Sequence, residues 1–330
     1  MDEATDWREV YDGGSPEAEN ESFLHFADML GGIQEATRRK AGWDHPRRTL
    51  HARQTIGIED ARLIVHANMP ARFRQGHFAE AQSLAAVLRF SNASATCQPD
   101  STPDMRGIAI RLTLPSGGIH DLLMTSFPVS HARNARQFVD FAVIASSCDR
   151  TTLVPRLVAH FGEAEATRML SNVQQAARRS PGLAFERFWS RGAFLWGAAG
   201  PVRFNLRPLS QQEFADAAEP EDLRANFAAR LRLGDVAFRL AVQMFVDETD
   251  TPIEDGAVEW REAVTPSIDI ATLIIPARKH IDPDASARVD ALSFNPWNAP
   301  TDFRPLGNLN RARGVAYDSS AARWGRGRLK

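Results

Sequence analysis

The sequence contains little cysteine and tyrosine, with two residues of each among 330. Cys97 and Cys148 fit neither a disulfide framework nor a metal-binding spacing. No apolar stretch is long enough to span a bilayer, and the acidic start Met1-Asp2-Glu3 has no positive segment leading into an apolar run. We therefore expect a cytoplasmic protein with neither a secretory signal nor a membrane span.

The sequence also lacks a strong excess of charge of either sign. Its formal net charge is −2, and its 43% hydrophobic and 24% charged residues are typical of a globular protein. This balance predicts no general attraction to nucleic acid. The chain shows no internal repeat and no glycine-rich phosphate loop, so neither a repeat architecture nor a nucleotide-binding loop is predicted.

The order of the predicted elements points to an α+β fold. Residues 1–14 are expected to form a disordered or loosely docked tail, and residues 15–330 a single domain that begins with a helix at Ser15-Pro16. Helices are also predicted within 135–180, within 220–232 and near the C-terminus. The predicted strands are 63–65, 86–90, 108–114, 202–207, 238–244 and 268–275. Because strands and helices do not alternate, we expect an antiparallel sheet or barrel with helical insertions.

The tyrosine near the C-terminus stands out by its neighbours. Arg313 precedes Tyr317 by four residues, so on a helix the guanidinium shares a face with the phenol oxygen and favours its ionised form. Tyrosinate is one of the few protein ligands of haem iron. A half-buried tyrosine on a basic helix is the simpler interpretation of this stretch alone. The surrounding basic residues are compatible with a solvated tail, a contact for bound carboxylates or a polyanion patch; they are Arg311, Arg313, Arg323, Arg326, Arg328 and Lys330.

Several motifs along the chain resemble those of the catalases, in the same order. They are Arg48-x-x-His51-Ala52-Arg53, Leu88-Arg89-Phe90-Ser91, Met105-Arg106-Gly107-Ile108-Ala109, Asp121 through Pro128 with Arg133 and Phe138, and Arg313-x-x-x-Tyr317. A lone histidine beside a basic loop is more often structural than catalytic. The catalytic interpretation of His51 therefore depends on the other motifs that occur in the same order as in the catalases. The chain is shorter than a typical catalase and resembles the small catalase-related haem proteins.

The resemblance implies a fold, a cofactor and a set of site residues. The implied fold is an eight-stranded antiparallel β-barrel with helical insertions and a C-terminal helix that carries the haem ligand. Haem b is the implied cofactor, with Tyr317 as the iron ligand. The other implied roles are a distal base at His51, a hydroxyl hydrogen-bonded to it at Ser91, haem contacts at Arg48, Arg89, Arg313 and Arg323, and a ring stacked on the porphyrin at Phe138.

Some residues depart from the catalase pattern. Thr125 and Ser126 stand where catalases have paired asparagines, and Ser130 and His131 where they have two phenylalanines. We expect Thr125 and Ser126 to belong to the catalytic pocket, which is then more polar than that of a catalase. Arg323 is one residue short of the corresponding catalase spacing from Tyr317.

The resemblance predicts a haem peroxidase that reduces hydrogen peroxide or organic hydroperoxides, with a small organic molecule as reductant and no nucleic-acid partner. One alternative is an enzyme that rearranges fatty-acid hydroperoxides, as allene oxide synthases do, because the polar residues suit such a divergence. Another is a haem carrier or sensor without catalysis, which would need only the tyrosine ligand. A homo-oligomer is compatible with each of these hypotheses.

Overall fold

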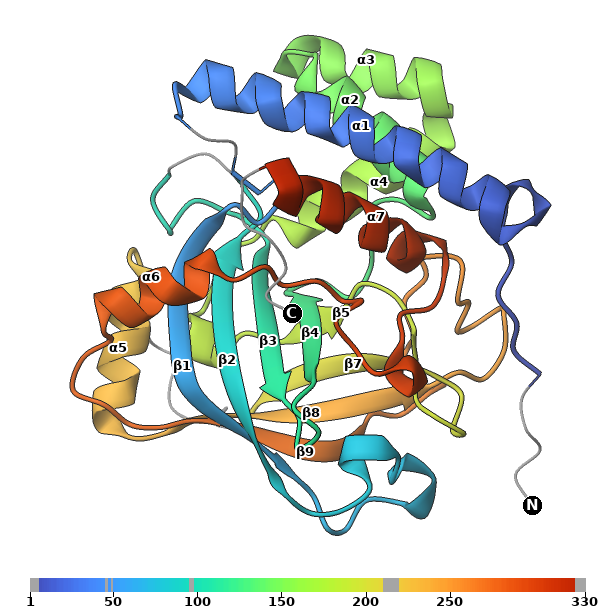
Figure 1. The fold of residues 1–330 in the computed structure, drawn as a ribbon. Helices are drawn as coiled ribbons and strands as arrows, with labels where there is room; N and C mark the ends of the chain where they lie inside the picture. The colour runs from blue at the N-terminus through green and yellow to red at the C-terminus, as the bar shows by residue number, and fades with distance from the viewer. Residues whose placement is uncertain (1–5, 45–46, 49, 95–97, 210–219, 324–330) are drawn as a thin grey trace.

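The computed structural model describes residues 6–44, 47–48, 50–94, 98–209 and 220–323, and its centre is an antiparallel β-barrel (Figure 1). The strands are β1 Arg53–Val65, β2 Ser83–Asn92, β3 Arg106–Thr113, β4 Ile119–Thr125, β5 Phe188–Ser190, β6 Phe194–Leu195, β7 Pro201–Pro208, β8 Val236–Met244 and β9 Ile268–Ile275. They pair in the order β5-β4-β3-β2-β1-β9-β8-β7, and β5 also pairs with β7, which closes a ring of eight strands. Strand β6 is attached to β7 outside the ring. The predicted α+β barrel is confirmed.

Alternation along the strands separates the barrel core from the face that carries the polar motif residues. On β2, Leu88 and Phe90 are fully buried in the main hydrophobic core. Arg89 and Ser91 have the opposite parity, and successive side chains of a strand point to opposite faces of the sheet. Arg89 and Ser91 therefore lie together on the outer face of the barrel.

Seven helices within the described residues surround the barrel. They are α1 Pro16–Ala41, α2 Ala135–Ser146, α3 Arg150–Phe161, α4 Glu163–Ala176, α5 Leu223–Leu233, α6 Pro283–Ala291 and α7 Asn308–Arg323. In Figure 1, α7 lies between the barrel and α1, and α3 lies beyond α1. Helix α2 packs against α1, α3 and α7, and α4 packs against α3. None of the helices in the described part of the chain is both long and apolar enough to cross a membrane.

The first helix begins where its sequence predicts. The Ser15 hydroxyl accepts a hydrogen bond from the backbone N–H of Ala18 at 3.2 Å, and Pro16 occupies the first turn. Gly42 ends the helix in the left-handed conformation, with φ of 64°. Phe23 and Phe26 are buried and join a cluster that includes residues of α2 and α7. The helix thus holds α7 from the side opposite the barrel.

Helix α6 was not among the predicted elements. Its nine residues bury only Ser286 and Val289, which leaves too little apolar periodicity for a helix to be predicted from sequence. Asp282 caps its N-terminus by accepting a hydrogen bond from the backbone N–H of Asp284. The helix packs against β1 and β2, so it places Asp290 beside the polar outer face of the barrel.

The segment before α1 is docked by ion pairs on the described residues from Asp6 onward. Glu9 pairs with Arg304 at 2.6 Å and with Arg311 at 2.9 Å. Arg311 also pairs with Glu19 at 2.6 Å and with Glu254 at 3.0 Å. Burial lowers the pKa of Arg311, but the hydrogen bonds that its guanidinium donates to Glu19 and Glu254 outweigh this effect and raise the pKa above its ordinary value. The carboxylates that contact Arg311 thus belong to the protein itself. The basic residues Arg326, Arg328 and Lys330 lie outside the described residues.

Candidate active site

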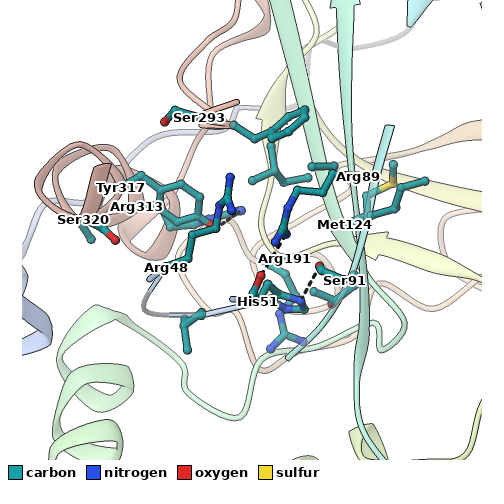
Figure 2. Close-up of a pocket in the computed structure, with 18 of the residues that line it drawn as sticks. Arg48, His51, Arg89, Ser91, Met124, Arg191, Ser293, Arg313, Tyr317 and Ser320 are labelled. Atoms are coloured by element: carbon teal, nitrogen blue, oxygen red, sulfur yellow. Dashed lines mark hydrogen bonds between the residues drawn. The ribbon is translucent and has the colours of Figure 1, made fainter. Parts of the chain in front are cut away.

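A cavity of about 880 Å³, open mouth included, lies between the outer face of β2 to β4 and helix α7. Figure 2 shows side chains from both walls pointing into it. Most of the site residues predicted from the sequence line this cavity: Arg48, His51, Arg89, Ser91, Thr125, Arg313 and Tyr317. Residues more than 260 positions apart, such as His51 and Tyr317, therefore meet at one site.

On α7, a short chain of hydrogen bonds positions the tyrosine. Arg313 Nη2 donates to Tyr317 Oη at 3.3 Å, and Arg313 Nη1 donates to Asn310 Oδ1 at 2.9 Å. Asn310 is fully buried, and its amide nitrogen donates to the backbone carbonyl of Ala193 at 2.8 Å. The guanidinium is thus fixed on one side by the barrel and presents its other nitrogen to the phenol oxygen, as the spacing of Arg313 and Tyr317 predicts.

Helix α7 is held close to the loop that precedes it. Trp297 Nε1 donates to the backbone carbonyl of Asn310 at 2.8 Å. A Cβ atom on Gly314 would lie 2.9 Å from the same Trp297 Nε1. Glycine at position 314, three residues before Tyr317, therefore permits α7 to pack closely against Trp297.

On the barrel wall, His51 is held by its backbone and by its ring. Its Nδ1 lies 3.2 Å from Ser91 Oγ, and its carbonyl accepts a hydrogen bond from Arg89 Nη1 at 3.0 Å. Its φ of 51° is in the left-handed region, which a residue with a side chain seldom adopts. A Cβ atom on Gly107 would lie 2.6 Å from His51 Nδ1, so glycine leaves the room that the imidazole occupies.

The electrostatic surroundings keep His51 neutral. Burial, together with the charges of Arg89, Arg191 and Arg313, lowers the pKa of His51 to about 3. A neutral imidazole carries one nitrogen with a free lone pair and one N–H. At neutral pH the ring is therefore uncharged, with a lone pair on one nitrogen, and its lowered pKa means that it readily releases a proton that it has accepted.

Two arginines predicted to contact a cofactor share one carboxylate. Arg48 Nη1 and Arg89 Nε lie 3.0 Å and 3.1 Å from the same oxygen, Asp290 Oδ1. Arg48 also donates to the backbone carbonyl of Leu292 at 2.6 Å. These contacts hold both guanidinium groups at the edge of the cavity, and the role of Asp290 was not predicted from the sequence.

Arg191 also lines the cavity and was missed in the sequence. It follows the three-residue strand β5, where no periodicity marks an inward-pointing side chain. Burial, and then the charge of Arg313, lowers the pKa of Arg191 to about 10, while the phenol of Tyr317 opposes this effect. One of its nitrogens donates to the backbone carbonyl of Val129. The cavity is thus more cationic than the sequence motifs suggest.

Three of the predicted site residues lie elsewhere among the described residues. The Ser126 hydroxyl accepts a hydrogen bond from the backbone N–H of Arg106 at 2.9 Å. Phe138 packs in the cluster between α1, α2 and α7, with its ring centroid 5.0 Å from that of His131. Arg323 Nη2 donates to Asp28 on α1 at 3.2 Å. None of these three side chains lines the cavity, whereas Thr125 does.

His131, a polar departure from the catalase pattern, is also absent from the cavity lining. Its ring centroid is 4.6 Å from that of Phe141, and its Nε2 is buried without a hydrogen-bond partner. Burial, followed by the charges of Arg191 and Arg168, lowers its pKa to about 3. The added polarity at this position therefore lies behind the cavity wall.

The comparisons with known proteins agree with this geometry. No family model matches the chain. A catalase-related peroxidase of Mycolicibacterium paratuberculosis is 25% identical over 253 residues, which are 73% of this chain and 78% of that protein. A bacterial catalase superimposes with a TM-score of 0.63 at 15% identity, and a fungal catalase with 0.64 at 14%. The chain has the catalase fold.

These similarities are consistent with the catalase superfamily, so the resemblance inferred from the sequence motifs is confirmed. Each superposition covers 88% of this chain but only 60% of the bacterial and 61% of the fungal catalase. The chain therefore spans well under two thirds of the length of those catalases.

Proposed function

We propose that the protein is a haem-dependent peroxidase of the catalase-related type that reduces hydrogen peroxide or organic hydroperoxides. One observation carries this proposal: the His51–Ser91 pair and the Arg313–Tyr317 pair enter the same cavity, one from the barrel and the other from α7 (Figure 2). A proton acceptor and an anionic metal ligand on two walls of one cavity suit the activation of a peroxide. The similarity to a catalase-related peroxidase supports the same reaction class.

The residues of the cavity fit haem b. The Tyr317 phenol oxygen would hold the iron, and Arg313 Nη2 donates a hydrogen bond to this oxygen. Arg48 and Arg89 supply guanidinium groups for the haem carboxylates. Leu123 and Phe294 add apolar lining on which a porphyrin can lie.

Bound haem would supply the electrons that break the peroxide O–O bond. The side chains of this chain position the peroxide and move its proton. His51, neutral because of its lowered pKa, accepts a proton from one peroxide oxygen at the nitrogen that does not face Ser91. It then returns this proton to the departing oxygen, so it acts as general base and then as general acid. Ser91 holds the imidazole in the orientation that both steps need.

The alternatives have less support. The hypothesis that the protein rearranges fatty-acid hydroperoxides depended on a more polar pocket. Of the three polar residues Thr125, Ser126 and His131, only Thr125 lines the cavity. A haem carrier would need Tyr317 but not the paired His51 and Ser91. Incubation with a polyunsaturated hydroperoxide tests the first alternative, because epoxide formation without a reductant would favour rearrangement over peroxidase activity.

A tyrosine exchange tests the proposed function, and the chain offers a matched control. Wild-type protein should take up haem and oxidise a phenol with hydrogen peroxide. Tyr317→Phe should purify largely without haem or with a shifted Soret band. Tyr11→Phe should behave as wild type, because Tyr11 packs under Arg311, with its ring centroid 4.5 Å from the guanidinium carbon. Wild-type haem content and spectrum in Tyr317→Phe would refute the assignment.

A further inference from the structure

A second cavity, of about 1590 Å³ with its open mouth included, adjoins the candidate active site. It lies where the end of α1, the start of β1 and the helices α5 and α6 meet. Among the residues that the structure describes, four arginines line it, namely Arg47, Arg48, Arg53 and Arg224, against two carboxylates, Asp44 and Asp290. The lining is therefore cationic, unlike the overall composition of the chain, and two of its arginines, Arg47 and Arg224, have no role in the motifs or in the proposed mechanism.

Two of these arginines are neutralised by the protein. Arg53 pairs with Asp100 at 2.9 Å, and Arg48 pairs with Asp290 at 3.0 Å. Both are fixed in place by these contacts, since Arg53 also donates to the backbone carbonyl of Gln98. Arg48 and Arg53 thus form a rigid part of the cavity wall, and Asp290 and Asp100 compensate their positive charge.

The other two arginines have no carboxylate partner among the described residues. The Arg47 guanidinium carbon lies 4.4 Å from the ring centroid of Trp43. Arg224 makes one weak polar contact, from Nη1 to Ser286 Oγ at 3.5 Å. Guanidinium groups bind carboxylates in a planar, two-point geometry, and cavities with such donors fix the orientation of small ligands. Arg47 and Arg224 are thus available to an anion that enters from solvent.

The two cavities share a wall. Arg48 lines both cavities. Asp290 lines the second cavity and forms ion pairs with Arg48 and with Arg89, which lines the first cavity. A molecule in the second cavity would therefore be separated from the proposed haem pocket by a wall that includes Arg48. Such a molecule could deliver electrons across this wall without entering the peroxide site.

We propose that this second cavity binds a small organic carboxylate, which serves as the reducing substrate. The carboxylate would bind to Arg47 and Arg224, and the Trp43 ring would contact its apolar part. The role as reductant rests on the proposed peroxidase function. The oxidised group of this carboxylate would be a phenol. In the balanced reaction, two such phenols each lose one electron and one proton, and the hydrogen peroxide that they reduce becomes two waters.

Calorimetric titration with two related phenols tests the binding site without any turnover. We expect 4-hydroxyphenylacetate to bind to the holoprotein more tightly than 4-methylphenol, which lacks the carboxylate. Arg47→Gln and Arg224→Gln should each weaken the binding of 4-hydroxyphenylacetate about tenfold, the lower end of the contribution of a hydrogen bond to a charged group. Arg232→Gln is the matched control, because Arg232 is an exposed arginine on the same helix as Arg224 and donates to the carbonyl of Lys279.

Equal affinity for the two phenols, or unchanged binding in both Arg47→Gln and Arg224→Gln, would overturn the proposed site. Steady-state kinetics test the role as reductant: the KM for 4-hydroxyphenylacetate should rise about tenfold in the two variants. If the protein binds the carboxylate but takes up no haem, the peroxidase function and the reductant role both fail, while the binding site stands. Haem uptake without selective carboxylate binding would refute the site alone.

Discussion

The contact between Arg313 and Tyr317 allows a quantitative prediction. Arg313 Nη2 donates to the phenol oxygen at 3.3 Å, and Nη1 is anchored by Asn310. A hydrogen bond to a charged group contributes about 1.5–3 kcal/mol, and the charge-assisted bonds at the strong end measure about 2.7–2.9 Å. Because the distance here is longer, we take the contribution of this hydrogen bond at the lower end of that range, about 1.5 kcal/mol. Arg313→Gln should therefore raise the Kd for haem about tenfold.

The assay is a haem titration of the apoprotein, followed at the Soret band. Arg323→Gln is a suitable comparison, because Arg323 lies on the same helix but pairs with Asp28 outside the cavity. Its Kd for haem should stay close to that of the wild type. Redox titration gives a second measure, since a weaker tyrosinate donor should raise the ferric/ferrous midpoint potential of Arg313→Gln.

Two results would contradict this reasoning. An unchanged Kd and midpoint potential in Arg313→Gln would mean that the arginine does not stabilise the ionised phenol. An equal loss of affinity in Arg313→Gln and Arg323→Gln would point to a general effect of positive charge on α7. Circular dichroism of both variants establishes whether α7 stays folded.

Two further predictions concern histidines. His51→Ala should retain haem, while its reaction with peroxide in stopped-flow mixing slows by about 10²–10⁴-fold, the usual contribution of general acid–base catalysis. Ser91→Ala should show a smaller defect; a wild-type rate in His51→Ala and a loss in His131→Ala would relocate the base to His131. Burial lowers the pKa of His77 from 6.5 to about 4, so the unfolded state binds a proton that the native state excludes between these values. The free energy of unfolding should therefore fall by roughly 3 kcal/mol from this group as pH drops through that window, and His77→Gln should flatten the slope in urea titrations. An identical slope would show that His77 is protonated in the native state.

Local spacing made much of the site predictable. Arg313 and Tyr317 share a helix face because four residues are close to one helical turn. Arg89 and Ser91 share the outer face of the barrel because side chains alternate along a strand. Because strands and helices do not alternate, the sequence predicted an antiparallel sheet or barrel, and the resemblance to the catalases implied the closed barrel. The two inferences on side-chain position depend on neighbours within a few residues, which sequence periodicity records directly.

Contacts between distant segments required the tertiary structure. Arg323 is six residues after Tyr317, which is about 240° further around the helix, so it faces α1 and Asp28. Asp290 reaches Arg48 and Arg89 because α6 packs on β1 and β2. Arg191 enters the cavity from a strand too short to show periodicity. Arg47 and Arg224 line one cavity although 177 positions separate them. Such neighbours are set by how the chain packs in three dimensions, and no local pattern of side chains encodes that packing.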